Sequence, residues 1–113
     1  MATLDESQMN GVKVLRLAGN LTREGVEQVE PAFAAAVRGG PRVVVDLDGV
    51  DLLTTPGITM LLAAQRELKQ ARGRLVLSGV RGMTDDVLRR CRLQTILPVA
   101  PSLNEAVEQA SIV

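Results

Sequence analysis

Three consecutive β-branched residues, Val43, Val44 and Val45, constrain the fold of this chain more than any other feature. Successive side chains of a strand point to opposite faces, so an unbroken apolar run predicts a strand that is buried on both faces. Strands of this kind occur in parallel sheets whose two faces are covered by helices. The rest of the chain must therefore supply those helices.

The segment before this run has helical spacing. Val26, Val29 and Phe33 recur at intervals of three and four, which predicts a helix from Thr22 to the Gly39-Gly40-Pro41 stop. Pro31 is expected to kink this helix, because a proline removes one hydrogen bond of the helix interior.

The segment after the run predicts a second helix. Thr55 is expected to be its N-cap, with Pro56 in the first turn and Gly73 closing it. Met60, Ala63 and Ala64 lie partly off the main apolar face of this helix. Two alternatives stay open for them: an exposed docking surface for a partner, or part of a wide buried face.

The remaining segments continue the alternation. The apolar residues from Val12 to Leu17 predict one or two short strands that end at Gly19. Short apolar runs predict further strands at 75–77 and 96–99, the last at a sheet edge because of Pro98. Helices are expected after the caps Thr84 and Ser102. The sequence therefore predicts one α/β domain over residues 1–113, with a core at about 12–110. Its mixed, mostly parallel sheet should have four to five strands, with about four helices.

The composition excludes several classes of site. The 113 residues include no His, Trp or Tyr and a single cysteine. The missing His excludes His-based acid–base catalysis and the common zinc sites, and one cysteine cannot form an internal disulfide. We expect a chain that is not an enzyme and holds no metal or cofactor, with Cys91 as a buried structural thiol. Asp46, Asp48 and Asp51 are a minor candidate for a cation site.

The charge pattern limits the partners. The formal net charge is zero, which gives no electrostatic reason to expect nucleic acid or an anionic membrane as a partner. We interpret the basic cluster of Arg89, Arg90 and Arg92 as a solvated helix face. No apolar run approaches the roughly 18 residues of a membrane span, and the acidic, polar N-terminus is unlike a signal peptide. These features predict a cytoplasmic protein without membrane insertion.

The stretch from Val44 to Ile58, VVDLDGVDLLTTPGI, resembles the signature of STAS domains, the family of bacterial anti-sigma-factor antagonists and transporter-associated domains. The Leu17–Thr22 segment is similar to the Gly-x-Leu-Asp element of that family. Further similar segments follow in the order of the family, so the resemblance covers roughly residues 12 to 110. They are LVLSG at 75–79, the Val87-Leu88 helix, ILPV at 96–99 and SLNEA at 102–106.

The resemblance implies a protein-interaction switch. In the family a Ser/Thr kinase phosphorylates the first hydroxyl of an Asp-Ser-Ser-Gly turn, which corresponds to Thr55 here, with Thr54 as the second candidate. Thr54 and Thr22 stand where the family has acidic residues. The implied partner is an anti-sigma factor with kinase activity or a stressosome-type protein. The expected partner-binding residues are Asn20, Thr22, Thr54, Thr55, Pro56, Gly57 and Met60.

Other functions stay open at this point. The chain is also compatible with a small STAS subunit of a membrane transport complex, where it would be an assembly element and Thr55 only a helix cap. Binding of a small molecule at the strand-to-helix end is neither supported nor excluded, and a weak homodimer is permitted.

Overall fold

The computed structural model describes residues 1–111, which form four strands and four α-helices. The strands are β1 (Ala2–Met9), β2 (Val12–Leu21), β3 (Arg42–Leu53) and β4 (Arg74–Ser78). The α-helices are α1 (Arg23–Arg38), α2 (Thr55–Gln70), α3 (Gly82–Arg90) and α4 (Leu103–Ser111), with a 3-10 turn η1 (Leu93–Thr95) before α4. Within this range no helix is both long and apolar enough to cross a bilayer.

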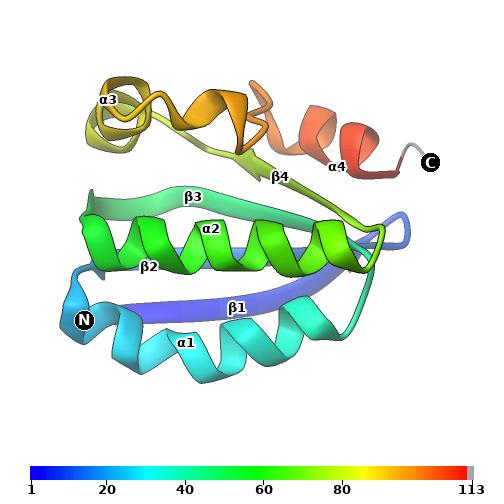
Figure 1. The fold of residues 1–113 in the computed structure, drawn as a ribbon, viewed down its shortest axis with the longest axis horizontal. Coiled ribbons are helices and arrows are strands. Elements are labelled where there is room, and N and C mark those ends of the chain that lie inside the picture. The colour runs from blue at the N-terminus through cyan, green and yellow to red at the C-terminus, as the bar shows by residue number, and fades with distance from the viewer. Residues whose placement is uncertain (112–113) are drawn as a thin grey trace.

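The sheet has the order β1-β2-β3-β4 (Figure 1). β2, β3 and β4 are parallel, whereas β1 pairs with β2 in the antiparallel sense. Helices α1 and α2 contribute to the large apolar cluster on one face, and α4 covers the second cluster on the other face. The expected α/β domain with a mixed, mostly parallel sheet and four helices is confirmed.

The valine run lies at the centre of this arrangement. Val43, Val44 and Val45 have no solvent exposure. Val43 and Val45 join the cluster beneath α1 and α2, while Val44 joins the cluster beneath α4. The strand is therefore buried on both faces, as its sequence predicts, because each face has its own helical cover.

Two strands differ from the expectation. β1 was not predicted, because most of its side chains are exposed at the sheet edge and its sequence lacks an apolar pattern. Residues 96–99 were expected to form a strand, and that prediction is wrong. η1 occupies the chain just before them, and only Val99 forms a bridge, to Leu77 of β4.

Two local predictions are also wrong. α3 begins at Gly82 instead of after Thr84, whose buried hydroxyl donates to the carbonyl of Arg81 at 2.7 Å. Cys91 is exposed, because it follows the last turn of α3 and no element covers it. Pro31 lies on the exposed side of α1, and the helix continues past it to Arg38.

Met60 belongs to the core. Its side chain is 3% exposed and packs in the cluster that contains Phe33 of α1, whereas Ala63 on the same helix is exposed. The expectation that Met60 is a surface contact for a partner is therefore corrected: α1 lies beside α2 and covers this position.

Met60→Lys is expected to lower the free energy of unfolding by about 2–5 kcal/mol, because it removes core packing and buries an unpaired charge. Ala63→Lys is the matched control and should change stability by no more than about 0.5 kcal/mol. Urea unfolding followed by far-ultraviolet circular dichroism measures both, since the chain has no Trp or Tyr for fluorescence. Unchanged stability of the Met60 variant would contradict its placement in the core.

Candidate functional site

The candidate site lies where two parallel strands end and two helices begin. β2 ends at Leu21 and β3 at Leu53, and these two residues are neighbours in the sheet. The helix that follows each strand begins within two residues, so the starts of α1 and α2 lie at the same edge (Figure 1). In open α/β sheets this carboxyl edge is where binding sites usually form.

Thr54 connects the two strand ends. Its hydroxyl donates a hydrogen bond to the carbonyl oxygen of Leu21 at 2.9 Å, and its backbone N–H points to the same oxygen at 3.3 Å. Thr54, not Thr55, is the N-cap of α2, with an extended backbone. Because its hydroxyl is directed to β2, the side chain makes no cap hydrogen bond to α2.

Thr55 is the first residue of α2, and its side chain is exposed. The expectation that it is the N-cap is wrong by one position. Among residues 1–111 its hydroxyl has no hydrogen-bond partner, in contrast to that of Thr54. It is therefore free for chemistry or for contact with a partner.

Gly57 allows the start of α2 to approach β2 closely. A Cβ at this position would lie 2.9 Å from the Cβ of Leu21 and 2.8 Å from a methyl of Leu53, closer than real contacts permit. Pro56 precedes it in the first turn, where the missing N–H has no helical acceptor in any case. This spacing keeps Thr55 at the surface while Gly57 is buried.

The other residues expected at the site come from β2 and the start of α1. Asn20 is exposed at the end of β2. The hydroxyl of Thr22 caps α1, accepting a hydrogen bond from the N–H of Gly25 at 3.4 Å. The structure thus brings together at one edge all the predicted residues except the buried Met60. They are Asn20, Thr22, Thr54, Thr55, Pro56 and Gly57.

The N-terminus of α2 differs from those of the other α-helices in residues 1–111. Each of the other three has an acidic residue in its first turn, whereas α2 has none. α1 and α4 are also capped by the hydroxyls of Thr22 and Ser102, as predicted for Ser102. The positive end of the α2 dipole is therefore compensated by neither a side-chain cap nor a carboxylate.

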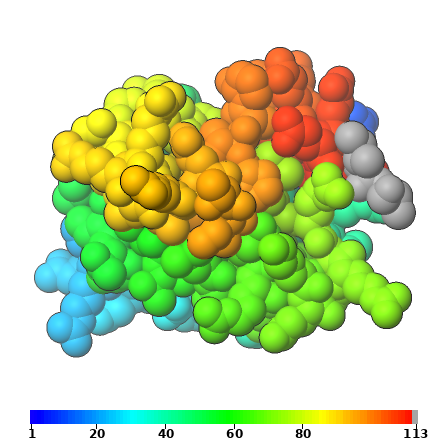
Figure 2. Space-filling view, turned by 45° about the horizontal axis from the view of Figure 1, so that its top comes forward, coloured from blue at the N-terminus to red at the C-terminus, as the bar shows by residue number. Residues whose placement is uncertain are grey.

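Two half-buried apolar side chains of α2 lie on the same side of the helix as Thr55. Ile58 and Leu62 follow Thr55 at intervals of three and four, and both are half-buried. The next position on this ridge is Gln65, which donates from its side-chain amide to the carbonyl of Ile96 at 2.8 Å. The ridge therefore faces the segment after α3, which lies against α2 in the space-filling view (Figure 2).

Sequence reasoning missed the role of Arg81 beside this edge. Its guanidinium donates to the carboxylate of Asp48 at 2.8 Å and to the carbonyl of Asp48 at 2.7 Å, which fixes the start of α3 to β3. The hydrogen bond and the negative charge of Asp48 raise the pKa of Arg81 above its usual value. A loop arginine three residues after a strand carries no sequence signal for such a pair.

The aspartates at this edge pair with protein groups. Asp46 accepts from the N–H of Asp48 at 3.0 Å and lies 3.6 Å from the guanidinium of Arg16. No group of three or more potential metal ligands occurs in the described part of the chain. On α3, Arg89 and Arg90 form ion pairs with Asp85 and Asp86.

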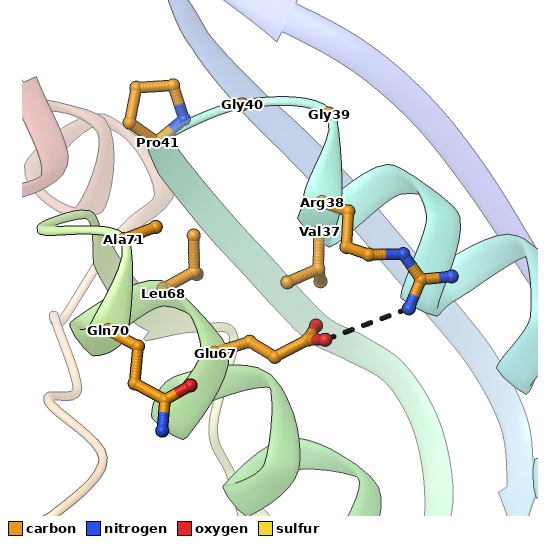
Figure 3. A pocket seen from close by; sticks show the side chains of 9 residues that line it. All are labelled: Val37, Arg38, Gly39, Gly40, Pro41, Glu67, Leu68, Gln70 and Ala71. Carbon is orange, nitrogen blue, oxygen red and sulfur yellow. Dashed lines mark ion pairs between the residues drawn. The ribbon is translucent and has the colours of Figure 1, made fainter.

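A hollow of about 520 Å³ lies at the opposite end of α1 and α2 from Thr55. Figure 3 shows it between the last turns of the two helices, where Arg38 pairs with Glu67 across 3.7 Å. The Gly39-Gly40-Pro41 loop closes one side. Since this hollow does not reach the starts of the helices, it is separate from the candidate site.

Comparison with known proteins identifies relatives of the whole domain. The family model described as "Mlab, STAS domain" matches residues 5–98. The chain is 31% identical to a protein of Bordetella bronchiseptica named "Putative anti-sigma factor antagonist BtrV", over 91% of this chain and 90% of that protein.

Solved structures show the same fold. An anti-sigma factor antagonist from Mycobacterium paratuberculosis superimposes with a TM-score of 0.90 at 23% identity, covering 99% of this chain and 96% of the other. The phosphorylated form of the Bacillus cell fate determinant SpoIIAA superimposes with a TM-score of 0.70 at 20% identity, over 95% of this chain and 98% of the other.

The two adjacent threonines predict different responses to loss of the hydroxyl. Thr54→Val removes the donor to Leu21 and should lower the free energy of unfolding by about 1 kcal/mol. Thr55→Val makes the same substitution at an exposed position and should alter the free energy of unfolding by less than about 0.5 kcal/mol. Urea unfolding curves of the two variants measure this difference. Equal losses would show that the hydroxyl of Thr54 has no special structural role.

Proposed function

Because this chain belongs to the STAS domain family, we propose that it is an anti-sigma factor antagonist whose binding is switched by phosphorylation of Thr55. In this proposal the unmodified chain binds an anti-sigma factor at the edge formed by the starts of α1 and α2. A Ser/Thr kinase, either the anti-sigma factor itself or a component of a stressosome-type assembly, adds the phosphate. The chain provides a recognition surface in the cytoplasm and performs no catalysis.

One observation carries the proposal: an exposed threonine with a free hydroxyl begins a helix whose dipole has no other compensation. The hydroxyl of Thr54 is held by Leu21 and is half-buried, which makes it a poor substrate. Thr55 is therefore favoured over Thr54 as the modified residue. SpoIIAA, which has the same fold, is a protein with a phosphorylated form.

A phosphate on Thr55 fits the molecule itself. It would add about −1.5 to −2 charges and three strong acceptor oxygens at the positive end of α2. The N–H groups of Thr55 and Gly57 in that first turn have no helical acceptors, and Pro56 has no N–H. The modified chain should consequently keep its fold, and the effect should fall on the partner.

The same phosphate would oppose a partner that matches the unmodified surface. The surface formed by the exposed Thr55 and the half-buried Ile58 and Leu62 is uncharged and partly apolar. A partner packed against it would have to remove water from the phosphate, and a loss of about 1.4 kcal/mol already reduces affinity tenfold. One modification thus suffices to release a complex.

A negative charge at position 55 is expected to stabilise the isolated chain. Thr55→Glu should be more stable than the matched Thr55→Gln by about 0.3–1 kcal/mol at pH 7, because only the carboxylate interacts with the helix dipole. This difference should vanish as the pH falls below the glutamate pKa of about 4.3, where the carboxylate becomes protonated. Urea unfolding of both variants at pH 7 and at a pH below this pKa measures the difference in stability. If Glu is no more stable than Gln at pH 7, the N-terminus of α2 is not open as described.

The switch itself is tested by affinity capture from a lysate of the source cells. Thr55→Ala should retain an anti-sigma factor, identified by mass spectrometry, whereas Thr55→Asp should retain at least about tenfold less. Thr59→Ala and Thr59→Asp, at an exposed position one turn further along α2, are matched controls and should both bind.

Two results would contradict the switch. If Thr55→Ala and Thr55→Asp capture the same protein equally, the hydroxyl is not a control point. If that protein is a component of a membrane transport complex, the chain is an assembly element and Thr55 has only a local structural role.

A further inference from the structure

A smaller hollow lies between the end of α2, the start of β4 and α4, at the end of the molecule away from Thr55. Its volume is about 250 Å³, and its lining includes Lys69, Arg74 and the carboxamides of Gln65 and Gln109. No carboxylate belongs to this lining within residues 1–111. The charged groups of this lining are therefore all positive, beside two carboxamides and the apolar Leu75, Val76 and Pro98.

The helix dipole explains the position of Lys69 at this end of the molecule but not those of Arg42 and Arg74. Lys69 lies in the last turn of α2, where a cation is favourable for any helix. Arg74 lies on β4, and its sheet neighbour on β3 is Arg42. Like charges directly opposite each other destabilise a sheet. Neither arginine forms an ion pair with a carboxylate among the described residues.

The backbone holds this unfavourable arrangement in place. The N–H of Arg74 donates to the carbonyl of Pro41 at 2.7 Å, and a Cβ on Gly73 would collide with that same oxygen. Arg72 just before them has a φ of +60°, a left-handed conformation that favours glycine. The two loops are thus fixed side by side, so Arg42 and Arg74 cannot separate without breaking this contact.

One hydrogen bond holds the guanidinium of Arg74 in place, and its remaining N–H donors are available to a ligand. It donates one hydrogen bond to the backbone carbonyl of Gln109 on α4 at 3.3 Å. A guanidinium has five N–H donors in a planar fork that matches phosphate oxygens. Gln65, buried in the adjoining wall, is held by its bond to Ile96.

We propose that this hollow binds a phosphate group, with Lys69 and Arg74 as its charged donors and Arg42 adding positive potential beside them. A bound dianion would offset the repulsion between Arg42 and Arg74. The volume is below the usual range of about 300–1,000 Å³ for larger organic ligands, so the bound part is a phosphate or a short phosphate ester. This site is independent of Thr55 and of the proposed switch.

The test titrates the full chain with inorganic phosphate at constant ionic strength, following backbone amide shifts by NMR. We expect saturable shifts at Lys69, Gly73, Arg74 and Gln109, and a higher melting temperature, because a ligand that binds only the folded state stabilises it. Arg74→Gln and Lys69→Gln should each weaken binding by about tenfold. Arg38→Gln is the matched control, since Arg38 lies at the same end but outside this hollow.

A second arm distinguishes free phosphate from a lipid headgroup. Vesicles of phosphatidic acid in phosphatidylcholine are compared with vesicles of phosphatidylcholine alone in a flotation assay. If the phosphatidic acid vesicles capture the chain, Arg74→Gln abolishes this capture, and free phosphate also binds saturably, the bound group is a lipid headgroup. If free phosphate binds but the vesicles do not capture the chain, the bound group belongs to a soluble ester. Equal shifts with chloride, or equal loss in Arg38→Gln and Arg74→Gln, would overturn the proposal.

Discussion

The arrangement of the candidate site depends on a single acceptor, the carbonyl oxygen of Leu21. Both the N–H and the hydroxyl of Thr54 point to it, and Gly57 provides the space for α2 to lie against it. This contact joins the end of β2 to the start of α2. It also directs the hydroxyl of Thr54 away from the helix, which leaves the first turn of α2 open and Thr55 at the surface. An exposed hydroxyl at an uncompensated helix start follows from one partly buried hydrogen bond.

The architecture was largely predictable because its central strand has a strong local signal. Val44 can be buried only if the sheet is covered on both faces, and the helical spacing around it supplies the cover. β1 could not be predicted, because an edge strand with mostly exposed side chains needs no apolar pattern. The first residues of α2 and α3 differ from the predicted ones for a related reason. Thr54 and Thr84 bond to tertiary or backward acceptors, which local cap preferences do not describe.

The residues of the site followed from the family resemblance, and their roles needed the structure. Thr54 and Thr55 are adjacent and chemically identical, yet one hydroxyl is held by Leu21 and the other is free. Met60 follows the same helix and is buried by α1. The zero net charge likewise does not show how the charged residues are distributed over the molecule. The fold places like-charged Arg42 and Arg74 together at one end, while Asp48 and Arg81 pair beside the other.

The central claim, that Thr55 is the control point of this surface, is tested most directly by locating the phosphate. The chain is purified from its source cells, or after co-expression with the kinase of those cells, and the modified residue is mapped by peptide mass spectrometry. We expect a single phosphate on Thr55, with Thr54 and Thr59 unmodified. A stoichiometric phosphate on Thr54 or on any other residue, with Thr55 unmodified, would contradict it.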